Sequence, residues 1–393
     1  MSYVHISRCA DYDESRVEAA IRESVAALGG MESIVRPGDR VVLKPNLLRP
    51  ALVEEGITTH PAVVKAVARL VQEAGGIPTI VDGPGGPHNS AYLRLVYATS
   101  GMERVARETG AAICHDMRIN RVPHPQGHLI KLVEMLAVIA EADVLINLPK
   151  LKTHGLMTMT GAIKNLFGAI PGVTKAGYHA KLQTKERFAQ MLVDVHQACR
   201  PALTIMDGIV GMEGNGPSNG ELRQVGLVLA SRDGIALDVV AAALVGIAPL
   251  DVPPLAVATA WGLTSSQVED ITVGGVPLAE ARLAVPFKLP KTVTGGGRGS
   301  RRGLLSRLVD RGWLTRQLVV NPVANDRCTA CGTCVQSCPV QAITIETVST
   351  PGGQKRRAHM DLNKCIRCYC CHELCPYDAV DLKRHWLAEP IVR

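Results

Sequence analysis

Two short cysteine runs near the C-terminal end constrain the fold of this chain more than any other feature. Nine of its twelve cysteines lie between residues 328 and 375, and eight of them form two Cys-x2-Cys-x2-Cys-x3-Cys-Pro runs. The first run spans Cys328 to Pro339, and the second spans Cys365 to Pro376. Because the N-terminal sequence carries no recognisable export signal, this clustering favours a metal site over disulfide bonds.

The spacing of the runs predicts which metal group they hold. Bacterial two-cluster ferredoxins repeat this run, and the fourth cysteine of each run binds the other cluster. Zinc sites more commonly use separated Cys-x2-Cys pairs. We therefore expect two 4Fe-4S clusters, the first held by Cys328, Cys331, Cys334 and Cys375 and the second by Cys365, Cys368, Cys371 and Cys338. Cys370 is predicted to be an inert buried thiol rather than an alternative ligand.

The rest of residues 322–385 also resembles a two-cluster ferredoxin, a small α+β domain. Ala342–Ile345 and Ala379–Leu382 follow the two runs and are predicted to be short strands. The segment between the runs carries Lys355, Arg356 and Arg357 and is expected to form a solvated turn, with a docking loop as the alternative.

The larger N-terminal part alternates short apolar strands with helical patterns. This alternation predicts an α/β fold, with a mostly parallel open sheet and helices on both faces. Aromatic residues make up only 3% of the chain, so we expect an aliphatic core. The predicted strands are 41–43, 78–81, 143–148, 203–206 and 226–230, and the predicted helices are 61–74, 158–169 and 233–246.

Polar residues follow directly after several of these strands. Ligands bind at the carboxyl ends of parallel strands, so we expect these side chains to converge. The residues concerned are Lys44, Asn46, Asp82, Lys150, Lys152, His154 and Asp207.

The segment 149–168 concentrates positive charge. Thr158 or Thr160 is predicted to cap its helix, whose first amides would attract an anion. A carboxylate or phosphate would suit this site, with His154 as proton donor. Solvated loop charges and a structural histidine are the alternatives. We predict His154, Lys152 and Lys164 as catalytic residues, and Lys44, Asn46, Asp82, Lys150, Asn165, Asp207 and Glu213 as substrate-binding residues.

Two glycine stretches, 83–86 and 211–216, match neither common phosphate-binding pattern, so we do not predict a nucleotide site. Residues 288–316 carry eight basic residues and one acidic residue, which accounts for the whole net charge of +7. A charge confined to one connector argues against nucleic-acid binding. No apolar stretch is long enough to predict a membrane span. We expect a cytoplasmic protein divided into 1–287, a basic linker with a helix at 288–321, and 322–393.

Several motifs resemble the family known as domain of unknown function 362. They are Lys44-Pro45-Asn46, Thr58-Thr59-His60-Pro61, the stretch from Pro149 to His154 and the stretch from Thr160 to Gly168. The resemblance covers about residues 40–250, and members of the family often carry a C-terminal two-cluster ferredoxin module. It implies this architecture and electron transfer, and it gives no catalytic residues to carry over.

These features favour a ferredoxin-coupled reductase of a small anionic molecule. The alternative is an electron carrier or adaptor whose α/β domain docks a redox partner. A low-potential ferredoxin or flavodoxin is the expected electron donor. A flavin and an oligomeric state are both compatible with the sequence but are not indicated by it.

Overall fold

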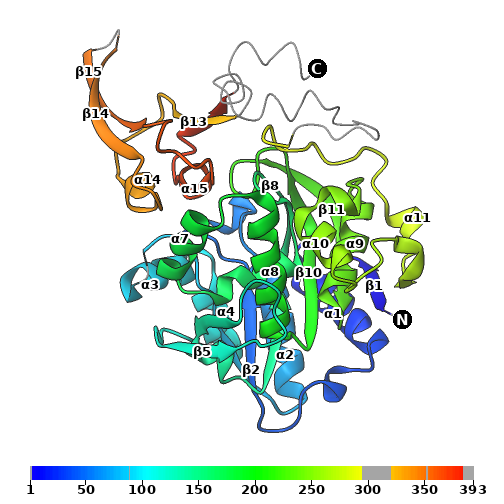
Figure 1. Cartoon of the computed structure of the whole chain (residues 1–393). Coiled ribbons are helices and arrows are strands. Elements are labelled where there is room, and N and C mark those ends of the chain that lie inside the picture. Colours follow the sequence, from blue (N-terminus) through cyan, green and yellow to red (C-terminus); the bar gives the residue numbers. More distant parts are fainter. Residues whose placement is uncertain (1, 88, 294–319, 351–352, 384–393) are drawn as a thin grey trace.

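The computed structural model describes residues 2–87, 89–293, 320–350 and 353–383. Its centre is a ten-stranded sheet in the order β12-β1-β11-β10-β7-β2-β3-β4, with β8 paired to β10 and β9 (Figure 1). Most neighbours are parallel, whereas β11 runs antiparallel to β1 and β10. The strands are β1 (Tyr3–Arg8), β2 (Arg40–Pro45), β3 (Ile77–Ile80), β4 (Ala112–Ile113), β7 (Val144–Leu148), β8 (Lys150–His154), β9 (Thr158–Thr160), β10 (Leu203–Glu213), β11 (Glu221–Ser231) and β12 (Thr272–Gly275).

Helices cover both faces of this sheet, which confirms the predicted fold class. Successive strand residues point to opposite faces. Val41 and Leu43 of β2 accordingly join one apolar cluster with α1 and α2, and Val42 joins another with α8, α9 and α10. The helices are α1 (Glu14–Ala27), α2 (Pro61–Glu73), α3 (Ser90–Thr99), α4 (Met102–Thr109), α5 (Ala137–Ala140), α6 (Ala162–Asn165), α7 (Gly172–Lys181), α8 (Lys185–Cys199), α9 (Gly234–Leu244), α10 (Pro253–Ala260) and α11 (Leu278–Ala281). A separate hairpin pairs β5 (Ile119–Pro123) with β6 (Leu132–Leu136).

The predicted helix at 158–169 is wrong at its start. Residues 158–160 form strand β9, and the helix begins only at Ala162. The hydroxyl of Thr160 donates to the Lys150 carbonyl at 2.8 Å instead of capping the helix. The carboxylate of Asp238 on α9 accepts the amides of Ala162 and Ile163, at 2.6 and 3.0 Å. Burial raises the pKa of Asp238 to about 7. The amides expected to attract an anion therefore already bind a carboxyl group from α9.

Residues 150–154 are also regular structure, which excludes the alternative that Lys150 and Lys152 are solvated loop charges. They form β8, which pairs with β10 in parallel and with β9 antiparallel. All five residues of β8 are buried, including two lysines and a histidine. Main-chain pairing on both sides therefore overrides the polar composition of the segment.

The C-terminal module contains two small antiparallel sheets. One pairs β13 (Asn321–Ala324) with β16 (Val380–Lys383), and the other pairs β14 (Ile343–Thr350) with β15 (Gly353–Met360). The segment between the cysteine runs was predicted to be a solvated turn, and it instead forms the hairpin of β14 and β15. Eight residues of each strand are in register, and the hairpin projects from the module (Figure 1). Two short helices, α14 (Thr333–Gln336) and α15 (Cys370–Glu373), follow within the two cysteine runs.

The helix predicted within the linker 288–321 lies outside the described residues, and the domain boundaries stay predictions. Among the helices that the structure describes, none has the length and apolar character needed to cross a membrane.

Candidate functional site

A cavity of about 440 Å³ lies where the C-terminal module meets the carboxyl end of the sheet. Its walls come from the loops after β2 and β3, from α6 and α7, and from the segments around α14 and α15. Figure 1 shows α14 and α15 at the same end of the molecule as α7. Parallel sheets commonly bind their ligands at this end. The polar lining residues are Lys44, Asn46, Asp82, Lys164, Asn165, Lys175, His179, Gln336, Ser337, Cys338, Cys370 and Glu373.

Lys44 and Asp82 form a buried ion pair at the base of this cavity. Their charged atoms are 2.6 Å apart, and the two side chains are at most 3% exposed. The Lys44 ammonium also donates to Asn165 Oδ1 at 3.2 Å. Burial lowers the pKa of Lys44, and the Asp82 carboxylate opposes this shift. A Cβ at Gly168 would lie 2.1 Å from Asp82 Oδ1, so only glycine leaves room for the pair.

Two other lysines at the cavity have no carboxylate within ion-pair distance among the described residues. Lys164 and Lys175 place their ammonium groups 4.9 and 5.6 Å from the centre of the Phe167 ring. Lys175 also donates to the Gly83 carbonyl. Burial lowers the pKa of Lys164 and lowers that of Lys175 to about 7. An anionic ligand would supply the counter-charge that both groups lack.

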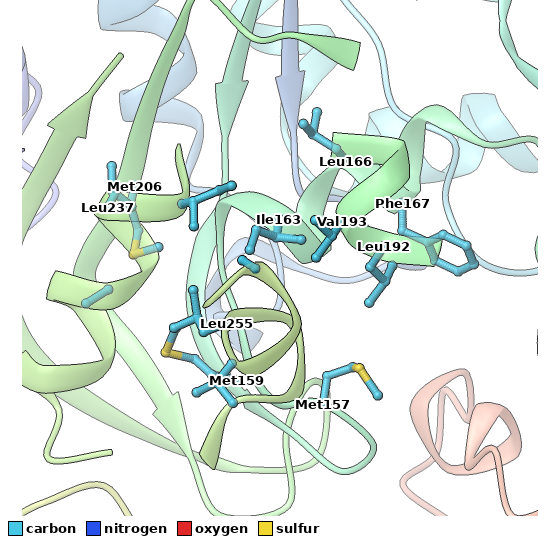
Figure 2. Packing of buried hydrophobic residues seen from close by; sticks show 14 of the residues in the cluster. Met157, Met159, Ile163, Leu166, Phe167, Leu192, Val193, Met206, Leu237 and Leu255 are labelled. Atoms are coloured by element: carbon cyan, nitrogen blue, oxygen red, sulfur yellow. The ribbon is translucent and has the colours of Figure 1, made fainter. Parts of the chain in front are cut away.

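The Phe167 ring that both lysines approach is fixed by the core behind it. It packs edge-on against Phe188 of α8, with ring centres 5.4 Å apart. Figure 2 shows Phe167 near Leu192 and Leu166 at one end of this apolar cluster. The ring that both ammonium groups approach is therefore held in place by the core.

His179 lies one helical turn after Lys175 on α7 and also lines the cavity. Its ring stacks on Phe188, with centres 4.4 Å apart and planes 24° apart. Burial, followed by the nearby Lys164, lowers the pKa of His179 to about 3. The imidazole is therefore neutral near pH 7.

Glu373 joins the C-terminal module to His154 of β8. Its carboxylate lies 3.4 Å from His154 Nε2. The other ring nitrogen of His154 accepts the amides of Leu156 and Met157, at 3.0 and 3.3 Å. These two amides assign the ring proton of neutral His154 to Nε2, facing Glu373. Burial raises the pKa of Glu373, and burial also lowers the pKa of His154 well below its usual value.

Further contacts hold the two parts of the chain together. Ser218 donates to the Glu373 carbonyl at 2.8 Å, and Asn219 donates to the His372 carbonyl at 3.3 Å. Gly85 packs so closely that a Cβ there would lie 2.6 Å from Leu374. The cavity is thus closed by contacts from both parts.

The remaining predicted site residues do not line the cavity. Lys150 pairs with Asp207 at 2.9 Å and also donates to the Tyr12 hydroxyl. The buried Lys152 donates to the Ile57 carbonyl at 2.6 Å. Glu213 pairs with Arg223 at 2.9 Å. The structure thus brings Lys44, Asn46, Asp82, Lys164 and Asn165 together at the cavity, and it places Lys150, Lys152, His154, Asp207 and Glu213 elsewhere.

The sequence reasoning missed Lys175, His179 and Glu373. Lys175 and His179 are four residues apart, which is the spacing of neighbours on one helix face. No helix was predicted there, so this signal was overlooked. Glu373 lies within the second cysteine run, whose spacing carries information on the cysteines alone.

The cysteines of the two runs gather around two smaller cavities. The first is lined by Cys328, Cys331, Cys334 and Cys375. The second is lined by Cys338, Cys365, Cys368 and Cys371, together with Cys370. Cys338 and Cys370 also line the large cavity, so the second cavity and the large one share a wall.

Main-chain amides point at the sulfur atoms of these cavities, as expected for cluster ligands. Ala342 donates to Cys338 Sγ at 3.2 Å, and Ala379 donates to Cys375 Sγ at 3.2 Å. Hydrogen bonds of this kind tune the reduction potential of an iron–sulfur cluster. Four thiolates per cavity and these donors fit a 4Fe-4S cluster.

Comparisons with known proteins agree with this arrangement. Residues 41–243 match the family model described as domain of unknown function (DUF362), and residues 327–379 match that of a 4Fe-4S dicluster domain. The chain is 38% identical over 306 residues to the "Thylakoid-associated protein sll1697" of Synechocystis sp., covering 74% of this chain and 92% of that protein.

Two further likenesses are more limited. Over 57 residues the chain is 40% identical to "NADH-quinone oxidoreductase subunit I 2" of Symbiobacterium thermophilum, covering 14% of this chain and 24% of that protein. The solved lactate racemase apoprotein from Thermoanaerobacterium thermosaccharolyticum has a TM-score of 0.34 at 13% identity, covering 60% of this chain and 55% of that one. The C-terminal part is an iron–sulfur electron-transfer module.

Proposed function

We propose that this chain, which belongs to the family described as domain of unknown function (DUF362) and ends in a 4Fe-4S dicluster domain, reduces an anionic small molecule bound in its large cavity. The wall that the large cavity shares with the second small cavity carries the proposal. Lys164 and Lys175 line the large cavity and lack carboxylate partners among the described residues. Cys338, the expected cluster ligand, lines both cavities. A bound anion would therefore lie next to a cluster site.

The grouping of the cysteines supports two clusters, each with the cross-ligation expected from the spacing. When bound, such clusters supply single low-potential electrons. In this proposal the first cluster site lies near the molecular surface, because Cys331 is exposed, and the second lies at the large cavity, because Cys338 lines both cavities. A protein donor would accordingly approach the first site. A ferredoxin or flavodoxin as that donor and a cytoplasmic location both remain predictions.

The side chains of the α/β part hold and orient the substrate in this proposal. Lys164 and Lys175 bind the anionic group, and the Lys44–Asp82 pair fixes the floor beneath it. The module closes over the cavity through Leu374 and Glu373 and limits the access of water. Lys152 and His154 act indirectly, since neither lines the cavity, and His154 Nε2 lies 3.4 Å from the Glu373 carboxylate.

Reoxidation of the chemically reduced protein tests this proposal. The protein is reduced under anaerobic conditions, freed of reductant and mixed with a panel of carboxylates and phosphates that each carry a reducible group, such as a carbonyl or a carbon–carbon double bond. We expect at least one compound to restore the absorbance of the oxidised clusters, and we expect Lys164→Met to slow this by about tenfold or more. Arg40→Met, at the far end of β2, is the control. Reoxidation by redox proteins alone would instead support the carrier or adaptor function.

Binding of a carboxylate probe should weaken as the pH rises. The Lys175 ammonium has a pKa of about 7, so it loses its proton, and with it its positive charge, as the pH rises through neutrality. A probe that stays ionised, such as benzoate, should therefore bind about tenfold less tightly at about pH 8 than at about pH 6. Calorimetric titration measures this change. The Lys175→Met variant should bind weakly with a flat profile, and an equally steep profile in that variant would assign the effect to another group.

A further inference from the structure

We propose that Cys370, His179 and Cys368 bind a single divalent late transition-metal ion at the wall between the second cluster site and the large cavity. Their potential ligand atoms, one ring nitrogen and two sulfurs, all lie within 4.8 Å of one another. Cys370 and His179 both line the large cavity. A metal ion placed among the three would therefore be reached from that cavity.

The number of cysteines around the second cluster site is the first argument. Five cysteines line it, and a 4Fe-4S cluster uses four thiolate ligands. The spacing assigns Cys365, Cys368, Cys371 and Cys338 to the cluster, so the Cys370 thiol is left over. Cys370 is buried, as the sequence predicted, and it also lies on the wall of both cavities.

The setting of His179 is the second argument. Stacking on Phe188 fixes its ring, and the edge of Phe167 lies against it at 5.8 Å between ring centres. Neither ring nitrogen has a hydrogen-bond partner within the part of the chain that the structure describes. A neutral imidazole without a competing partner can offer its lone pair to a metal ion.

The ligand set indicates the kind of ion. Thiolates and imidazole together favour ions such as Zn²⁺, Fe²⁺ or Ni²⁺ over Mg²⁺ or Ca²⁺. Three protein ligands leave a coordination position open, as in catalytic rather than structural zinc sites. The open coordination position would face the large cavity, where Lys164 and Lys175 are proposed to bind an anion. The negative charge of the thiolates offsets the repulsion from these two lysines.

This inference rests on the proposed second cluster, because Cys368 would bridge the cluster and the added ion through its sulfur. Acid-labile sulfide reports the clusters, and protein-bound zinc reports the added ion. The two proposals can therefore fail separately.

Zinc uptake by the cluster-loaded protein provides the test. Anaerobically purified protein is incubated with a small excess of Zn²⁺ and desalted, and its zinc, iron and sulfide are measured. We expect about one tightly held zinc ion per wild-type chain. Cys370→Ala and His179→Phe should each lose it, and the phenylalanine keeps the stack on Phe188. The control is Cys114→Ala, a buried cysteine whose sulfur lies 3.9 Å from the Asp116 carbonyl.

Retention of sulfide in all variants, with zinc lost only from the two site variants, would support the inference. Equal zinc in all four proteins, or none in the wild type, would overturn it. A fall in sulfide in Cys370→Ala would also overturn it, because Cys370 would then be a cluster ligand. A fall in sulfide on adding zinc to the wild type would mean that zinc displaces the cluster, which likewise contradicts the inference.

Discussion

Replacing Cys338 with alanine is expected to remove about half of the sulfide and to abolish reoxidation by an anionic substrate. Cys338 lines both the large cavity and the second small cavity, which is the proposed second cluster site. Its sulfur also accepts the Ala342 amide at 3.2 Å. Loss of this ligand would leave three cysteines of the pattern at the second site, next to the substrate. The measurements are sulfide content and the rate at which the reduced protein is reoxidised.

The matched control for Cys338→Ala is Cys331→Ala. Cys331 is exposed and lines the first small cavity, which is the proposed first cluster site and lies away from the large cavity. This variant should also lose about half of its sulfide. Its second site stays intact, so chemically reduced protein should still be reoxidised by the substrate. Equal loss of reoxidation in both variants would contradict the assignment of the second site to the cavity.

Replacing Lys44 with methionine is expected to lower the free energy of unfolding by about 3–5 kcal/mol. The variant leaves the Asp82 carboxylate buried without its partner at 2.6 Å. Asn165 would also lose the 3.2 Å hydrogen bond from the Lys44 ammonium. Urea unfolding followed by circular dichroism measures the change. The double variant Lys44→Met/Asp82→Asn removes both charges and should recover much of the loss.

Arg40→Met provides a comparison on the same strand. Arg40 lies at the other end of β2 and pairs with Asp143 at 2.9 Å, but its side chain is 62% exposed. An exposed pair of this kind contributes about 1 kcal/mol or less. Similar losses in Lys44→Met and Arg40→Met would show that burial does not set the strength of the Lys44–Asp82 pair.

Local patterns explain which parts of the fold were predictable. Strand β2, which contains Lys44, and strand β3, which precedes Asp82, follow from short apolar runs. The start of α2 follows from His60 and Pro61, where His60 Nδ1 accepts the Ala62 amide. Cysteine spacing is equally local, so the cysteines that line each of the two smaller cavities could be grouped from the sequence alone.

The errors arise where distant parts of the chain replace local partners. Asp238 is 76 residues from Ala162, yet it accepts the first amide of α6 in place of a threonine cap. Lys150 was expected at the site, but its partner Asp207 comes from β10 and holds it elsewhere. Part of the cavity wall comes from Glu373 and Leu374, which belong to the C-terminal module and line the cavity because that module packs against the α/β part. Sequence spacing carries no information on that docking.

Acid-labile sulfide in anaerobically purified wild-type protein tests the central claim most directly. The account requires two cluster sites, one near the surface and one at the wall of the large cavity. It predicts about eight sulfide ions per chain, with about four left in Cys338→Ala. A wild-type value of about four or fewer would contradict it, because one of the two cysteine-lined cavities would then hold no 4Fe-4S cluster.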